Sequence, residues 1–188
     1  MMDINNIRDR AQGVLEGSVT SKELEFARSI LNTSQGDIAS ALYIVGYCGN
    51  GDDAASIERY VEPPYAEVYG EIALKALCRY LKLIDRYRPF IKRLIFREES
   101  SWPGGRITAI QLSPDYLTGY KDDQVGCELV NILTDEQDED RIAARSALVI
   151  ILNLRDQIKR RAVSEIHDSD PDTKLILSAA KTRFRCEE

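Results

Sequence analysis

The side chains that most often perform catalysis or bind metal ions are scarce in this sequence. His167 is its only histidine, which excludes sites that need two, such as HExxH zinc sites or the paired motifs of di-iron enzymes. A Cys–His nucleophile pair would have to bring His167 to one of four cysteines, and no local motif indicates such a pair. We therefore expect a protein that is not an enzyme and has no catalytic residue, metal ion or cofactor.

Two short runs resemble ligand loops but lack essential residues. The acids of residues 167–172 alternate as in a calcium loop, yet the glycine of the sharp turn and the closing glutamate are missing. A loop between helices, with Asp172 as an N-cap, is the better interpretation. Gly104 and Gly105 lack the lysine and Ser/Thr of a phosphate-binding loop.

The four cysteines are spread along the chain with no CxxC pair. The first three lie beside Leu, Ile and Val in helical patterns, so the sequence predicts small buried apolar residues in a reducing compartment. No apolar run is long enough to span a membrane, and the N-terminus has no signal-peptide pattern. We expect a cytoplasmic protein with no membrane association. The cysteines are Cys48, Cys78, Cys127 and Cys186.

Acidic side chains are concentrated in residues 113–140, which hold nine acids and one base, Lys121. Some acids stand where helices should begin, and carboxylates favour that end of a helix. The others predict an acidic ridge that binds a protein partner with a cationic surface. Both interpretations stay open. The expected ridge consists of Asp115, Asp122, Asp123, Asp135, Glu136, Asp138 and Glu139.

Basic side chains are concentrated in residues 79–97, with seven bases and one acid, Asp85. Their stems can cover apolar residues on a solvated helix face. Alternatively, Tyr80 and Tyr87 between the arginines could stack on bases while the arginines contact phosphates. The formal charge of −6 and the pI of about 5 make nucleic-acid binding the less favoured alternative.

Tyrosine outnumbers the other aromatic residues, with nine Tyr against four Phe and one Trp. Three pairs are spaced i, i+4, so each pair shares a helix face: Tyr43/Tyr47, Tyr65/Tyr69 and Tyr116/Tyr120. Tyrosine suits both interfaces and the spaces between packed helices. Trp102 is an anchor if it is exposed, but not if it folds over the core. The expected aromatic contacts to a partner are Tyr69, Trp102, Tyr116 and Tyr120.

Apolar residues recur at intervals of three and four, which predicts an all-α chain of about eleven helical elements in one domain. The first helical face runs from Ile4 to Leu15, and Thr20 with Glu23 forms a capping box before the next helix. The prolines fall at or near helix junctions, except that Pro114 should end or kink its helix.

An internal repeat places a leucine after a small residue at nearly constant spacing. The intervals are 35, 35 and 36 residues, and the third match is weaker because Gln111 precedes its leucine. Helix pairs that cannot bury their apolar faces alone must stack, which predicts an α-solenoid. An irregular bundle of short helical hairpins is the alternative. The repeated leucines are Leu42, Leu77, Leu112 and Leu148.

Around these leucines the chain resembles the HEAT-repeat family, whose second helix is usually written V-R-x-x-A-x-x-A-L. The segments 140–148 and 69–77 carry the likeness, which covers about residues 21–154. The Val-Arg start is intact in no unit, Arg141 is the only arginine in place, and Gln111 and Pro114 depart from the pattern. The resemblance implies an α-α superhelix of about four to five pairs, with partner contacts on its second helices.

The expected domain spans 1–188, with a capping helix in 1–20, repeats in 21–154 and a helix pair in 155–188. We expect a non-catalytic protein-binding chain. Its acidic, tyrosine-rich helical character is also similar to bacterial immunity proteins, or antitoxins, that neutralise cationic toxins by direct binding. Other HEAT-like branches imply two alternatives: nucleic-acid binding through residues 79–97, as in DNA glycosylases, or a lyase such as the bilin lyases.

Overall fold

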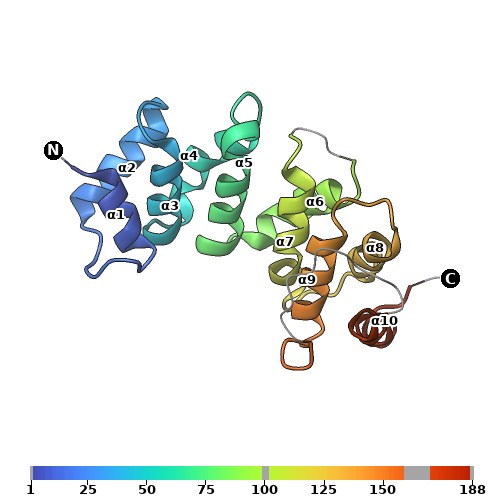
Figure 1. Cartoon of the computed structure of the whole chain (residues 1–188). Coiled ribbons are helices and arrows are strands. Elements are labelled where there is room, and N and C mark those ends of the chain that lie inside the picture. Colours follow the sequence, from blue (N-terminus) through green and yellow to red (C-terminus); the bar gives the residue numbers. More distant parts are fainter. Residues whose placement is uncertain (1, 99–101, 159–169, 187–188) are drawn as a thin grey trace. The chain divides into compact units, whose positions relative to one another are not determined.

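The computed structural model describes residues 2–98, 102–158 and 170–186, and every regular element in these ranges is helical (Figure 1). This confirms the all-α prediction. The α-helices are α1 (Ile4–Ala11), α2 (Ser21–Thr33), α3 (Ile38–Cys48), α4 (Ala54–Glu58), α5 (Ala66–Lys75), α6 (Ile84–Ile95), α7 (Gly105–Leu117), α8 (Asp123–Thr134), α9 (Arg141–Ile151) and α10 (Pro171–Arg183). Short 3-10 helices span Gly51–Asp53 and Arg59–Val61, and a π-helix spans Ala76–Tyr80.

Side-chain caps start several helices where the sequence predicted them. Thr20 and Glu23 form the expected capping box at α2. Asp122 caps α8 by accepting a hydrogen bond from the amide of Val125. The N-cap of α10 is Asp170, so the prediction that Asp172 fills this position is wrong. His167, and the rest of the calcium-like run before Asp170, lie outside the described residues.

The first helix is shorter than predicted. It ends at Ala11, and Gly13 follows in the left-handed region with φ of 73°. A glycine in that conformation ends helices, since other residues adopt it less readily. Val14 and Leu15 are consequently outside the helix and exposed, so the prediction that they continue its apolar face is wrong.

Two prolines lie inside helices. Pro114 does not end α7, which continues to Leu117, and Pro89 lies within α6 rather than at a junction. Because Pro114 has no N–H, it leaves the carbonyl of Ile110 without its usual helical donor. The Ser113 hydroxyl, which is buried, donates to that carbonyl at 2.7 Å. This bond explains how α7 tolerates the proline.

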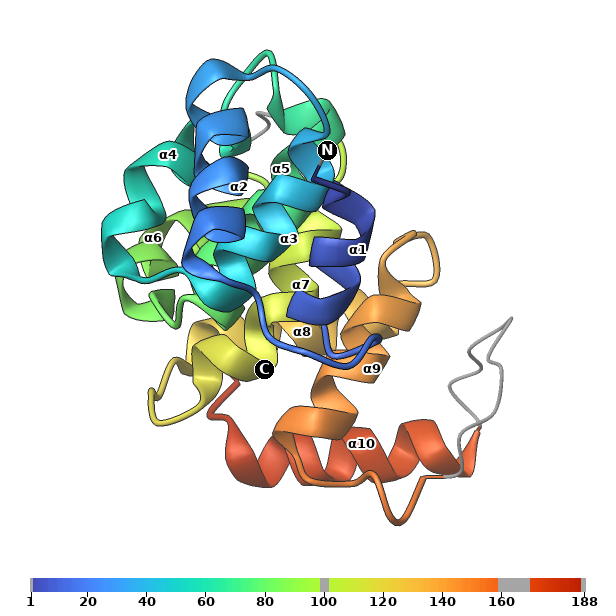
Figure 2. The same cartoon turned by 90° about the vertical axis from the view of Figure 1, so that its left-hand side faces the viewer.

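The contacts divide the chain into two compact units. The first comprises Met1–Tyr87 and Ser100–Gly105. Within it α3 packs against α1, α2 and α5, and Figure 2 shows α1, α2 and α3 side by side. Leu42 on α3 and Leu77 in the π-helix are fully buried. The π-helix brings Tyr80 onto Tyr47, with ring centroids 4.1 Å apart.

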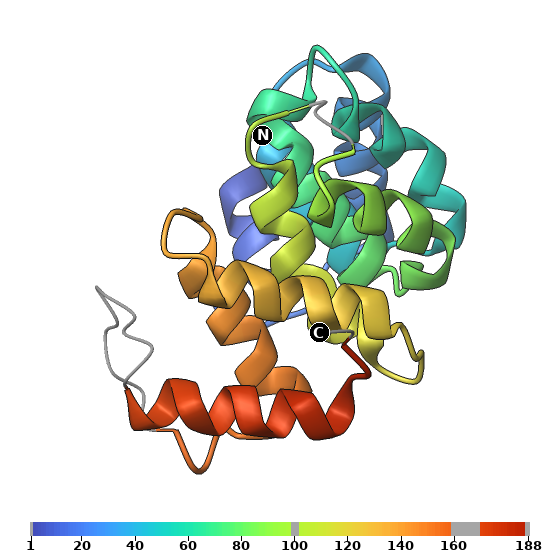
Figure 3. The ribbon, with the colours of Figure 1, turned by 90° about the vertical axis from the view of Figure 1, so that its right-hand side faces the viewer.

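The second unit comprises Arg88–Glu99 and Arg106–Glu188. Here α8 packs against α9, and α10 contacts both (Figure 3). Leu112 on α7 and Leu148 on α9 are fully buried. All four leucines of the repeat therefore lie in the core of their units.

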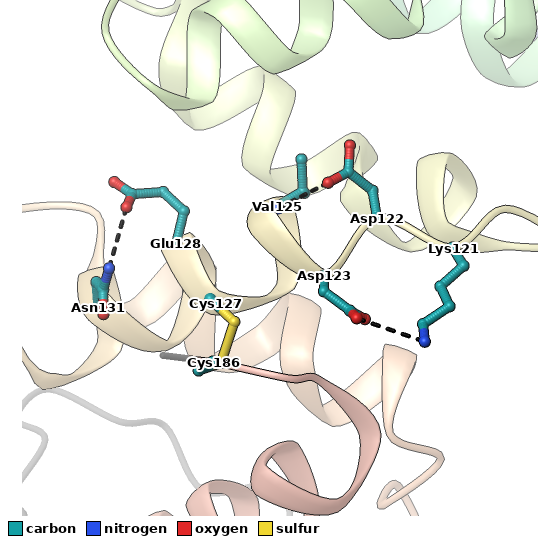
Figure 4. The surroundings of a disulfide bond; sticks show 8 residues. All are labelled: Lys121, Asp122, Asp123, Val125, Cys127, Glu128, Asn131 and Cys186. Atoms are coloured by element: carbon teal, nitrogen blue, oxygen red, sulfur yellow. Dashed lines mark hydrogen bonds and ion pairs between the residues drawn. A yellow bond between two sulfur atoms is a disulfide. The ribbon is translucent and has the colours of Figure 1, made fainter. Parts of the chain in front are cut away.

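A disulfide joins Cys127 on α8 to Cys186 after α10 (Figure 4). The prediction that the cysteines are reduced is thus wrong for this pair, while Cys48 and Cys78 are not in a disulfide. Close beside it, the Phe184 ring lies so near Gly126 that a Cβ there would come within 2.3 Å of it. Gly126 is therefore the residue that lets the C-terminal segment approach α8.

Candidate interaction surface

Asp122, one of the predicted ridge acids, is a structural residue. Its carboxylate accepts hydrogen bonds from Lys92 Nζ at 3.0 Å and from the Tyr116 hydroxyl at 2.8 Å. Burial alone would raise the pKa of Asp122, but the bonds from Tyr116 and Lys92 outweigh it and hold the pKa below its usual value. The acid therefore ties α6 and α7 to the start of α8.

Asp138 has a similar internal role. Its two oxygens accept from the guanidinium of Arg106, each at 2.9 Å, and Arg106 also donates to Asp140 at 2.7 Å. Arg97 lies 3.5 Å from Asp138. The hydrogen bonds from Arg106 overcome the effect of burial and lower the pKa of Asp138. These acids hold the start of α9 against α7.

The predicted ridge acids are spread from α7 to the turn before α9. Asp122 and Asp135 stand at opposite ends of α8, which at 1.5 Å per residue puts them roughly 20 Å apart. Asp123 pairs with Lys121 at 3.4 Å (Figure 4), and Asp115 lies on α7. The acidic ridge therefore stays a prediction, and three of its members, Asp122, Asp123 and Asp138, have cationic partners within the unit.

Three of the predicted acids remain exposed, all in the turn between α8 and α9. They are Asp135, Glu136 and Glu139. Asp135 accepts a hydrogen bond from the amide of Gln137 at 2.9 Å, which fixes the turn. Among the described residues, none of these three carboxylates has a cationic side chain within 4 Å, in contrast to Asp138 and Asp140. The uncompensated negative charge of the segment is concentrated here.

The basic residues 79–97 also make internal contacts. Lys92 and Arg97 pair with Asp122 and Asp138. The Arg88 guanidinium lies 4.2 Å from the Tyr120 ring centroid. Tyr87, which would stack on a base in the less favoured nucleic-acid alternative, is buried and donates to Glu58 at 2.5 Å. These contacts favour the interpretation of a solvated, partly paired helix face.

The predicted aromatic contacts differ in exposure. Tyr116 and Trp102 are buried, and the Trp102 indole lies 3.0 Å from a Cβ built at Gly70. Burial of Trp102 fits the interpretation in which it folds over the core, and removes both residues from a partner's reach. Tyr69 is half-buried against Tyr60. Tyr120 is exposed and contacts Tyr116 edge to face at 5.7 Å, so one predicted pair does share a face.

An apolar stripe on the exposed face of α9 was not predicted from the sequence. Ile142 and Ile150 are 46% and 41% exposed, opposite the helix face that buries Ala144 and Leu148. Ser146 lies between them, and its hydroxyl donates back to the Ile142 carbonyl at 2.8 Å. Hydrophobic periodicity assigns apolar residues to the core and therefore gives no reason to expect exposed isoleucines. The sequence feature that could have indicated their exposure is their position outside the repeat's small-residue face.

A pocket of about 340 Å³ adjoins the end of this stripe. Its apolar lining includes Ile150 and Ile151 from α9, and its charged lining is Asp115 and Arg183. Asp115 is the predicted ridge acid that reaches it. The pocket size is at the lower end of the range for small-molecule sites. The full lining is Pro114, Asp115, Leu117, Thr118, Gly119, Ile150, Ile151 and Arg183.

Comparisons with known proteins add no family or function. No protein-family model matches the chain, and no curated protein or solved structure was found to be similar to it. In the described ranges, His, Cys, Asp and Glu side chains form no group of three that could hold a metal ion. No helix within these ranges is both long and apolar enough to cross a membrane.

Proposed function

We propose that the chain is a non-catalytic protein-binding protein built from HEAT-like helix pairs in one repeat domain. The pairs are α2/α3, α4/α5, α6/α7 and α8/α9. Burial of the four equivalent leucines near the second helix of each pair supports the repeat. Arg28 on α2 pairs with Asp53 directly before α4, and Arg106 on α7 pairs with Asp138 in the turn before α9. These ion pairs fit the contacts expected of stacked pairs.

The observation that carries the binding function is the exposed stripe of α9. Two large isoleucines that face solvent beside a pocket form an apolar patch flanked by carboxylates, which is the arrangement of a protein interface. The partner should therefore bind the α9 side of the second unit, with the exposed acids at its rim.

A pull-down from the native host at physiological salt tests this function. The tagged chain should retain a stoichiometric protein, and Ile142→Asp with Ile150→Asp should abolish retention. Val68→Asp is the matched control, because Val68 is also exposed, on α5 of the first unit. Retention by the double variant, or an eluate of nucleic acid with no protein, would contradict the proposal.

The more specific proposal is toxin immunity, with a cationic toxin as the partner. Its support is the uncompensated charge of Asp135, Glu136 and Glu139 next to the apolar stripe. Co-expression with a toxin encoded next to this chain should restore bacterial growth. Absence of rescue by well-expressed protein would reject immunity while leaving the broader binding function intact.

A further inference from the structure

We infer that α9 binds a single amphipathic segment of its protein partner in one orientation. A large apolar side chain of that segment enters the pocket at Ile150, and basic side chains face the turn at Glu136 and Glu139. The inference rests on the proposed binding function and specifies the chemistry of the partner.

The length and composition of the stripe suit such a segment. Ile142 and Ile150 are eight residues apart, or roughly 12 Å along the helix. Ser146 between them is small, and its hydroxyl is used by its own helix. The face therefore has an apolar side chain at each end and a small uncharged one in its middle, and its length matches about two turns of a bound helix.

The two ends of the stripe differ in charge, and this sets the orientation. At the start of α9 stand the three exposed acids, while the neighbouring Asp138 and Asp140 are neutralised by Arg106. At the other end, the pocket carries one carboxylate and one guanidinium, Asp115 and Arg183, so its charges balance. A cationic side chain is favoured at the first end, and an apolar one among Ile150, Ile151 and their neighbours at the second.

Fluorescence anisotropy with designed peptides tests the inference. The probe is a labelled helical peptide of leucine and lysine with its lysines at one end. The intact chain should bind it, more weakly as salt rises, and should bind a counterpart with glutamine for lysine at least tenfold less tightly. Absence of binding, or equal binding of the two peptides, would overturn the inference.

Variants locate the binding. Ile150→Ser should weaken the lysine peptide about tenfold, as expected for an interface anchor worth 1 to 2 kcal/mol. Glu136→Gln with Glu139→Gln should remove much of the salt dependence. The controls are Val68→Ser and Glu67→Gln on α5, both at exposed positions, which should change neither property. Equal losses in the controls would show that the peptide does not bind α9.

Photo-crosslinking tests the orientation. A benzophenone at the apolar end of the peptide should label the residues around the pocket, and one at the lysine end should label the turn 135–139. The reverse pattern would overturn the inference. If the natural partner still requires Ile142 and Ile150 while the peptides fail, the chemistry assigned here is wrong but the binding function stands.

Discussion

In each unit an arginine on one helix pairs with a shielded carboxylate directly before the next helix but one, and the two arginines differ in burial. In the first unit, Arg28 donates to both oxygens of Asp53, at 2.7 and 2.9 Å, and its side chain is 25% exposed. In the second, Arg106 holds both Asp138 and Asp140 and is 12% exposed. In the second unit one arginine therefore serves two shielded carboxylates, and Arg97 is a more distant second partner of Asp138.

The largest effect is expected from removing these arginines. Arg106→Leu leaves Asp140 without a cationic partner and Asp138 with Arg97 alone, at 3.5 Å, and should lower the free energy of unfolding by about 3 kcal/mol. Arg28→Leu should cost about 2 kcal/mol, because water reaches Asp53 more easily once the arginine is gone. Urea unfolding of both variants measures the difference. Equal losses would show that the difference in exposure has no energetic consequence.

The next largest effect is expected from the disulfide, which stabilises the second unit but not the first. It closes a loop of 59 residues in the second unit, so reduction or Cys127→Ser with Cys186→Ser should destabilise that unit by about 2–4 kcal/mol. Hydrogen exchange read by segment should show the loss around α8 and α10, with the first unit unchanged. Cys48→Ser is the control. Faster exchange in α2 and α3 on reduction would contradict this assignment.

Acid should destabilise both units, because each contains a carboxylate whose pKa is lowered in the folded state. Hydrogen bonds from Arg10 and Thr20 lower the pKa of Glu23 in the first unit to about 2. Asp138 has a lowered pKa in the second unit. A lowered pKa stabilises the fold above the ordinary value near 4, and this stability is lost as pH falls through the folded value.

Urea unfolding from pH 6 to pH 2 should therefore show little change above about pH 5 and a steep fall below pH 4. Asp138→Asn should reduce that slope for the second unit, and Glu23→Gln should reduce it for the first. A slope unchanged in both variants would mean that other carboxylates cause the acid sensitivity.

The smallest effect concerns serines that donate to helix carbonyls. Ser113 is buried and serves the carbonyl left free by Pro114, so Ser113→Ala should cost about 1–2 kcal/mol. Ser29 makes a similar bond to Phe26 on an exposed part of α2, and Ser29→Ala should change stability by less than about 0.5 kcal/mol. Thermal unfolding of the two variants provides the comparison, and a larger loss for Ser29 would reverse it.

The sequence was a good guide wherever local patterns determine structure. The capping box at Thr20 follows from spacing within one helix, and the buried leucines from Leu42 to Leu148 follow from a repeat that recurs every 35 or 36 residues. Contacts between distant segments could not be predicted in this way. Arg106 and Asp138 are 32 residues apart, and Cys127 and Cys186 are 59 apart, so their meeting depends on how helices pack.

The candidate surface shows the same limit. Composition indicated the acids, but only the fold shows that Asp122 is occupied by Lys92 and Tyr116 while Glu136 and Glu139 are exposed. Hydrophobicity alone does not separate Ile142 from a core residue, because both faces of α9 carry apolar side chains, and only its position off the repeat's small-residue face sets it apart.

The π-helix at Ala76–Tyr80 changes the helical phase between α5 and Tyr80. Its wider turn, with the amide of Leu81 bonded to the carbonyl of Ala76 five residues earlier, accommodates one residue more than an α-helical turn. Deleting one residue here would restore the α-helical phase and rotate the residues after the deletion by about 100° relative to α5. The stacking of Tyr80 on Tyr47 thus depends on a one-residue insertion. The number of residues in this turn determines the position of the Tyr80 ring as much as the identity of the residues does.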